Sequence, residues 1–341
     1  MSSNIGKDIE PVLTVGITSY KRVNELIRCI KSIHTKYIDK IEILISEDHS
    51  PLSKEIAEAV HKLSEDSVYN IRFTTNEVNL GYDMNLGAII KKSRGKFIFF
   101  MSDDDAICDT CLDEIIPILQ NDDSHGVFYA PFVYVKTGKK DRNHGVNIDI
   151  PAGEQSASQY IYDSILFSGL IMRKEYVEGF DSSRFKNYNY FQVYMFLQMI
   201  YKYGGIYLKT PSVMCIEDGE NAYGLSESSG GNAILANRKS IKSNLEFNKT
   251  LIKVIRMFDE EMNTNVMKSF AKQYSLHSYS GLSIARSEGV KYFNEYWETL
   301  NKLDIKLYPI TKCYYIILLV LGKQNADKLL SGFRAKLKNE K

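Results

Sequence analysis

The chain has 341 residues, of which 44% are hydrophobic and 25% charged, and 43 basic against 42 acidic side chains leave a formal net charge of +1. These proportions are typical of a globular protein with a buried core, and they argue against a disordered chain or a disulfide scaffold. The balanced charge argues against a generic nucleic-acid binder, so no nucleic-acid partner is expected. The longest apolar run, residues 314–322, is too short for a membrane-spanning helix.

The N-terminal residues and the cysteines indicate a compartment. Residues 1–10 are polar and have no apolar core, unlike a secretory signal. Five cysteines, an odd number at scattered positions, are typical of a reducing environment. The sequence therefore predicts a cytoplasmic protein.

The first half of the chain alternates strand-like and helix-like periods. Strands are predicted over residues 12–18, 41–45, 71–75 and 96–101, with helical patterns around residues 26–33, 56–63 and 84–92 between them. Strands and helices that alternate at this spacing predict an α/β fold with a doubly wound, mainly parallel sheet.

The second half has a mixed pattern and then a helical one. Strands are predicted over residues 126–135, 165–173 and 206–209, and helices over residues 110–119 and 189–202. Residues 219–232 are rich in Gly, Ser and Asn and predict a loop, and residues 234–341 are almost wholly helical in pattern. We therefore expect a sheet domain over residues 1–232 and a helical domain over residues 233–341.

Polar clusters follow three of the predicted strands, at residues 18–22, 47–50 and 103–105. In open α/β sheets, ligands bind beyond the carboxyl ends of the strands. Asp103, Asp104 and Asp105 place three carboxylates on one short loop, which a hard divalent cation such as Mg²⁺ or Mn²⁺ would stabilise. The alternative is a solvated acidic turn in which an aspartate caps the following helix.

A set of short segments, taken in chain order, resembles the motifs of family 2 glycosyltransferases. These segments are Thr18-Ser19-Tyr20-Lys21-Arg22 for the opening T-Y-N-R turn, Glu47-Asp48-His49-Ser50 for D-D-G-S, Asn79-Leu80-Gly81 with Asn85 and Gly95-Lys96-Phe97-Ile98, Ser102-Asp103-Asp104-Asp105 for D-x-D, and Phe167-Ser168-Gly169 with Arg173 and Gly179-Phe180-Asp181. The resemblance covers about residues 11–215. It implies a GT-A fold and inverting transfer of a sugar from a nucleotide-diphosphate donor.

The resemblance also implies roles for individual residues. It implies that the donor nucleotide is bound by Thr18, Tyr20, Arg22, Asp48, Asp103 and Asp104, with Asp48 at the base and Asp103 near the ribose. It implies that Asp105, together with Asp103, holds Mn²⁺ or Mg²⁺ on the diphosphate, and that Ser168 and Gly169 lie on the sugar or acceptor side. A cation there would neutralise the charge that develops on the leaving diphosphate.

The general base is the point at which this sequence departs from the family pattern. Family members commonly carry Glu-Asp at the start of the helix after the Gly-Phe-Asp segment, whereas residues 190–193 here are Tyr-Phe-Gln-Val. Gln192 cannot accept a proton usefully at neutral pH. Asp181, although it also suits a structural turn, and Glu217, next to Asp218, are the candidate bases.

The composition of the C-terminal tail predicts a contact with a membrane. Residues 305–341 contain an apolar, aromatic run and eight Lys or Arg against two Asp or Glu. This combination suits an interfacial helix on an anionic membrane, which would place the protein at the inner face of the cell membrane, beside a lipid-linked acceptor. A packed core helix or a contact within a homo-oligomer is the alternative.

The sequence as a whole predicts a metal-dependent inverting glycosyltransferase in surface polysaccharide synthesis. Its donor would be a nucleotide sugar, a UDP-sugar by default, and its acceptor a glycan or a lipid-linked glycan. One alternative is a non-catalytic sugar- or nucleotide-binding protein, which the absence of a carboxylate near Gln192 favours. The other is a sugar-nucleotide nucleotidyltransferase, which would want a Gly-rich phosphate loop where residues 18–22 hold no glycine.

Overall fold

The structure, a computed structural model, describes residues 10–138, 145–216 and 241–339. Backbone contacts divide the chain into two compact units, residues 1–231 and residues 232–341. The loop predicted over residues 219–232 lies outside the described residues.

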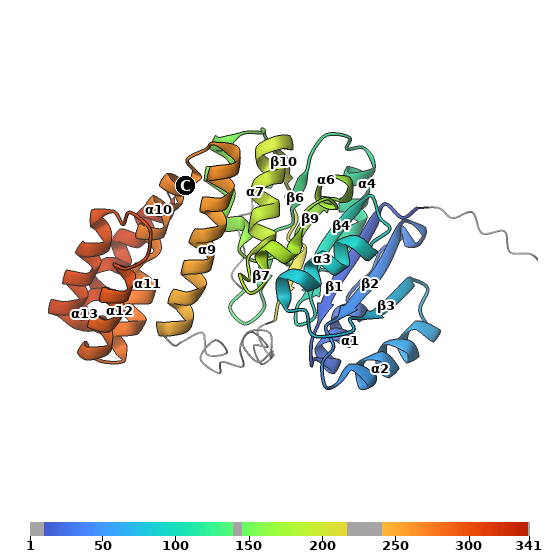
Figure 1. Cartoon of the computed structure of the whole chain (residues 1–341), viewed down its shortest axis with the longest axis horizontal. Helices are drawn as coiled ribbons and strands as arrows, with labels where there is room; N and C mark the ends of the chain where they lie inside the picture. The colour runs from blue at the N-terminus through green and yellow to red at the C-terminus, as the bar shows by residue number, and fades with distance from the viewer. Residues whose placement is uncertain (1–9, 139–144, 217–240, 340–341) are drawn as a thin grey trace, which may run out of the picture. The chain divides into compact units, whose positions relative to one another are not determined.

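An eight-stranded sheet in the order β3-β2-β1-β4-β9-β6-β10-β8 forms the frame of the first unit (Figure 1). In that order the strands are β3 (Asn70–Thr75), β2 (Ile41–Glu47), β1 (Leu13–Ser19), β4 (Phe97–Ser102), β9 (Leu170–Arg173), β6 (Val127–Tyr129), β10 (Gly205–Tyr207) and β8 (Ile148–Ile150). The first four pair in parallel, and β9 runs antiparallel to both of its neighbours. The prediction of an α/β fold with a mainly parallel sheet is confirmed.

Helices cover both faces of this sheet. They are α1 (Val23–Lys31), α2 (Ser53–Glu65), α3 (Tyr82–Lys92), α4 (Cys111–Gln120), α5 (Glu154–Tyr160), α6 (Lys174–Val177) and α7 (Phe191–Tyr203), with short 3-10 turns η1 (Ile38–Lys40), η2 (Ile161–Ser164) and η3 (Ser182–Phe185). Because side chains alternate along a strand, Val15 of β1 packs into one core with α1, α2 and α4. Gly16 faces α3 instead, where an added Cβ would lie 2.5 Å from Ile89. Helix α3 therefore packs closely on the second face.

Two predicted strands differ from the observed ones. The strand expected over residues 126–135 is split into β6 and β7 (Phe132–Tyr134), and β7 belongs to a separate three-stranded sheet with β11 (Val213–Cys215) and β5 (Ala106–Ile107). Pro131 separates the two halves because proline has no N–H for a ladder. The strand expected over residues 165–173 is confined to β9, since Gly169 precedes it with a left-handed φ of 99°.

The second unit is helical, as the sequence predicts. Its helices are α9 (Ile241–Met262), α10 (Val266–His277), α11 (Tyr279–Ser287), α12 (Val290–Leu300) and α13 (Pro309–Asn339). Helix α13 is interrupted at Gly322, whose φ is 69°. Among the helices of the described ranges, none is both long and apolar enough to cross a membrane.

Candidate active site

The carboxyl ends of β1, β2 and β4 meet at one edge of the sheet. In the register of the sheet, Thr18 of β1 lies opposite Ser102 of β4, and Ser19 lies opposite Glu47 of β2. The three polar clusters that the sequence singles out therefore follow neighbouring strands. Thr18 and Tyr20 are half-buried at this edge.

Arg22 binds two carboxylates of the acidic loop. Its Nη1 atom lies 2.9 Å from Asp103 Oδ1 and 2.9 Å from Asp104 Oδ2, and only 12% of its side chain is exposed. The second oxygen of Asp103 accepts the Tyr20 backbone N–H at 3.1 Å. The opening turn and the acidic loop are thus joined by charge-assisted hydrogen bonds.

Asp105 has a different environment from its two neighbours. Within the described residues it forms no ion pair, and its carboxylate is hydrogen-bonded to the Ser168 side chain. Ser168 Oγ also accepts the backbone N–H of Ser102 at 3.0 Å. The predicted metal-side residue Asp105 and the predicted acceptor-side residue Ser168 are therefore brought together by direct contact.

Burial makes the acidic loop electrostatically costly. It raises the pKa of Asp103 to about 7, against the lowering effect of Arg22. Burial, with the nearby charge of Asp104, also raises the pKa of Asp105 to about 7. Since Arg22 pairs with only two of the three carboxylates, added positive charge at this loop would be stabilising.

Gly169 fixes the backbone beside Ser168. Its φ of 99° suits glycine, and a Cβ here would lie 2.5 Å from the Ala130 carbonyl oxygen. The Gly169 N–H donates to the carbonyl of Phe100 on β4, 3.2 Å away. This close approach to β4 places Ser168 next to the acidic loop.

Asp48, predicted at the base, is engaged with its own surroundings. Asp48 Oδ1 accepts Asn76 Nδ2 at 2.9 Å and the Leu80 N–H at 2.8 Å, and Oδ2 accepts the Gly81 N–H at 2.8 Å. Burial raises its pKa, and these hydrogen bonds oppose the rise. Three of roughly four acceptor positions of the carboxylate are filled, so one remains for a ligand N–H.

The start of α7 holds no carboxylate of its own. Gln192, which is 2% exposed, donates through Nε2 to the Ile165 carbonyl at 3.1 Å, and its Oε1 is buried without a partner in the described structure. The N–H groups before and at the start of α7 are instead bound by Asp83, from α3. The amide of Gln192 thus occupies the region where family members commonly carry a carboxylate.

Of the two candidate bases, only Asp181 lies within the described residues, and it is engaged away from the acidic loop. Asp181 caps η3 by accepting the Ser183 N–H at 2.9 Å, and hydrogen bonds with the Ser183 side chain and N–H lower its pKa. Its charged neighbours are Lys91 and Arg184, at the carboxyl end of α3 and in η3, whereas the first turn of α3 lies at the Asp48 edge. Glu217 lies outside the described residues.

The oxygen donors of the loop fit a small divalent cation as a partial site. No group of three or more His, Cys, Asp or Glu side chains suited to a metal occurs in the described part of the chain. Asp103 and Asp105 supply two carboxylates, and Mg²⁺ sites at phosphates commonly use one or two carboxylates with substrate oxygens and water. The residues therefore fit a cation that arrives with a diphosphate.

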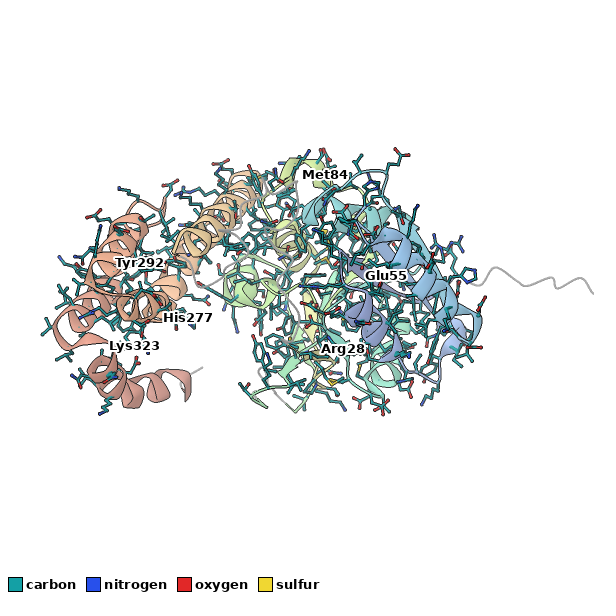
Figure 2. The ribbon with its side chains drawn as sticks, turned by 90° about the horizontal axis from the view of Figure 1, so that it is seen from below. Arg28, Glu55, Met84, His277, Tyr292 and Lys323 are labelled. Atoms are coloured by element: carbon teal, nitrogen blue, oxygen red, sulfur yellow. The ribbon has the colours of Figure 1, made fainter. Side chains whose placement is uncertain are left out.

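Sequence reasoning missed two residues that shape this site. Arg28 of α1 (Figure 2) donates through Nη2 to the Asp104 carbonyl at 2.9 Å and so holds the backbone of the acidic loop. It lies six residues after Arg22, which precedes the same helix, and this spacing gave no signal of a shared contact. Asp83 is the other, and its position just after the Asn79–Gly81 motif gave no indication of a contact with residues 188–191.

Comparisons with known proteins agree with this geometry. Residues 14–181 match the sequence profile described as Glycosyl transferase family 2. No protein of curated function matches the sequence significantly. Among solved structures, the crystal structure of S. aureus TarS 1-349 in complex with UDP-GlcNAc is 13% identical, with 92% of this chain and 91% of that chain covered and a TM-score of 0.50.

A second similar structure is the mannosyltransferase PcManGT from Pyrobaculum calidifontis in complex with GDP-Man and Mn²⁺. It is 13% identical, with 93% of this chain and 88% of that chain covered and a TM-score of 0.49. At such identities the likeness to TarS concerns the fold, which is GT-A. The family profile spans the strands that carry both the Asp48 turn and the acidic loop. Because residues 14–181 match this family, the chain belongs to glycosyltransferase family 2 and is a glycosyltransferase.

Proposed function

We propose that this glycosyltransferase is a divalent-metal-dependent, inverting enzyme that takes its sugar from a nucleotide-diphosphate donor. The observation that best supports the proposal is that the three carboxylates of the acidic loop are unequally ion-paired. Arg22 neutralises Asp103 and Asp104 in part, whereas the buried carboxylate of Asp105 has no ion pair among the described residues. Such a loop gains most from a cation bound with a diphosphate.

The site residues divide into two sides in this proposal. Thr18, Tyr20, Arg22 and Asp104 form the donor side, and the free acceptor position of Asp48 takes an N–H of the base. Asp103 and Asp105 would hold Mn²⁺ or Mg²⁺, which supplies positive charge to the leaving diphosphate. Ser168 and Gly169, next to Asp105, border the transferred sugar.

The general base is not assigned to a described residue. Asp181 lies away from the acidic loop and is bound to its own turn, so it is not carried into the proposal. The acceptor would be a glycan or a lipid-linked glycan, and a role in surface polysaccharide synthesis rests on analogy with the family.

Thermal unfolding with nucleotides tests the donor site. UDP and GDP are each added with and without Mn²⁺, and UDP-GlcNAc is the first sugar donor to try because TarS was solved with it. We expect one nucleotide to raise the melting temperature only with metal, and Asp105→Asn to lose that rise. Release of the same nucleoside diphosphate from its sugar donor would follow. No metal-dependent rise with either nucleotide would refute the proposed site.

We also propose a membrane contact through α13, which would suit a lipid-linked acceptor. Tyr314 and Leu318 on this helix are buried, whereas Ile316 is 48% and Val320 73% exposed. A surface helix that is apolar all round is unusual in water. Exposed lysines Lys312 and Lys328 flank the apolar face, and Lys323 (Figure 2), which is ion-paired with Asp327, follows the break at Gly322. Apolar area and basic charge together suit an anionic lipid surface.

Flotation with vesicles tests this contact. The wild type is expected to float with phosphatidylglycerol vesicles and not with phosphatidylcholine vesicles. The double variant Ile316→Asp, Val320→Asp should lose binding, whereas Val290→Asp, at a residue 47% exposed on α12, should keep it. A wild type that floats with neither, or a face that light scattering shows to join two copies of the chain, would refute the contact.

A further inference from the structure

The first turn of α3 contacts three parts of the first unit that are distant in sequence. The Gly81 N–H, which precedes the helix, donates to Asp48 at 2.8 Å. The Tyr82 ring meets the Phe167 ring edge-on at 5.3 Å between centroids, one residue before Ser168. Asp83 reaches the segment that leads into α7. This turn therefore joins Asp48 to the segment that carries Ser168 and to the segment before α7.

Asp83 binds three backbone donors of that segment. Its Oδ2 accepts the N–H groups of Tyr188 at 3.0 Å and Asn189 at 2.8 Å, and its Oδ1 accepts the N–H of Phe191 at 3.0 Å. The side chain is 1% exposed. Asn189 has a left-handed φ of 62°, a conformation that turns successive N–H groups toward one anion. The carboxylate and the shape of the segment thus depend on each other.

No nearby cation replaces these N–H groups. Asp83 forms no ion pair in the described structure. The charged side chains on the elements packed against α3 are Glu42 and Glu47 of β2, Arg184 of η3 and Lys202 of α7. Burial raises the pKa of Asp83 to about 6, and the backbone N–H groups oppose that rise. The carboxylate is therefore charged at neutral pH and becomes protonated below about pH 6.

We propose that Asp83 is a positioning residue for sugar transfer, whose carboxylate holds residues 188–191 so that the start of α7 closes the acceptor side of the site. The inference rests on the proposed function and names a residue that acts through others. Two observations distinguish it from a general contribution to stability. The same helix turn binds Asp48, and the segment it holds leads directly to Gln192, where the family commonly carries its base.

Hydrogen exchange tests the clamp without any substrate. In Asp83→Asn, an amide group cannot accept all three N–H bonds, so exchange at residues 188, 189 and 191 should rise about tenfold or more for each lost bond. The matched control is Asp259→Asn, which removes a similar carboxylate that binds the N–H groups of Val266 and Met267 at 2.8 and 2.9 Å in the helical unit. Wild-type protection at 188–191 should also fall between pH 7 and pH 5, after correction for intrinsic rates. Unchanged exchange in both measurements would overturn the clamp.

Donor hydrolysis tests the positioning role. With Mn²⁺ and UDP-GlcNAc or GDP-mannose, Asp83→Asn should leave the donor KM unchanged and lower kcat about 10- to 100-fold, since a misplaced segment affects the reacting geometry. Both proteins should lose kcat as the acidic loop becomes protonated below about pH 7, and the wild type should show an additional loss below about pH 6 that the variant lacks. Asp259→Asn should keep both constants.

The outcomes separate the two proposals. Faster exchange in Asp83→Asn with an unchanged kcat would overturn the positioning role and leave the proposed function intact. An equal loss of kcat in Asp259→Asn would overturn it as well, because general destabilisation would then explain both. A wild type that hydrolyses neither donor would refute the proposed function and the positioning role together, while the exchange data would still decide whether the clamp exists.

Discussion

Replacing Asp105 by asparagine is expected to stabilise the metal-free protein at pH 8. Burial raises the pKa of Asp105 from its usual 3.8 to about 7. Between about pH 4 and pH 7 the folded state therefore keeps a proton that the unfolded state has lost, so the free energy of unfolding falls as the pH rises. The gap between the two pKa values corresponds to at most about 4 kcal/mol. Asparagine keeps a hydrogen-bonding group for Ser168 and does not carry this cost.

Thermal unfolding in EDTA measures the effect. For a unit of this size, about 4 kcal/mol corresponds to an increase of roughly 10 °C in melting temperature at pH 8. At pH 5 the gain should shrink to less than half of that, because wild-type Asp105 is then mostly protonated in the folded state. Asp123→Asn is the matched control, since that carboxylate is 93% exposed and pairs with Lys96 at 3.3 Å. It should change the melting temperature little at either pH.

An Asp105→Asn variant that is less stable than the wild type at pH 8 would refute this reasoning. It would mean that the carboxylate has a favourable charge partner in the metal-free protein. A measurement with Mn²⁺ is independent of that result. Mn²⁺ with a bound nucleotide should stabilise the wild type more at pH 8 than at pH 5, because protons compete for the carboxylates below about pH 7.

Two further substitutions test the surroundings of the loop. Arg22→Met should lower the free energy of unfolding at pH 8 by about 3–5 kcal/mol, because it leaves buried Asp103 without its cation, and adding Asp103→Asn should recover much of that loss in urea unfolding. If the two substitutions changed the free energy of unfolding additively, the ion pair between Arg22 and Asp103 would be contradicted. Gly169→Ala should cost roughly 1–3 kcal/mol, because φ is 99° and the new Cβ would lie 2.5 Å from the Ala130 carbonyl. Gly179→Ala has open space around it, and an equal loss there would show that the close approach is not the cause.

The fold could be predicted where the sequence pattern is long and local. The β-branched run over residues 12–18 and the apolar periods that follow it correspond to β1 and α1 within one or two residues. Strands β5, β8 and β11 have only two or three residues each, too few to show a period. They form because partners distant in the chain pair with them, as β7 and β5 do with β11. That information is absent from any local window.

The location of the site could be predicted from the sequence, but the ion pairs and hydrogen bonds among its side chains could not. Strand-end reasoning places the acidic loop, the opening turn and Asp48 at one edge, and the register of β1, β2 and β4 puts them there. Which carboxylate takes which donor depends on side-chain geometry. Arg22 was expected to bind the donor, and its side chain is ion-paired with Asp103 and Asp104. A bound diphosphate would compete with those carboxylates for it.

The missing carboxylate near Gln192 has a physical explanation in the same geometry. The N-terminus of a helix attracts negative charge through its free N–H groups and dipole. Here Asp83 already supplies that charge from α3 and binds the N–H groups of residues 188, 189 and 191. A carboxylate at position 192 would be buried, as the 2% exposed Gln192 is, and would gain none of those donors, so its charge would be costly. A neutral amide at this position avoids that cost, and under the proposed inverting transfer the proton acceptor would come from outside the first turn of α7.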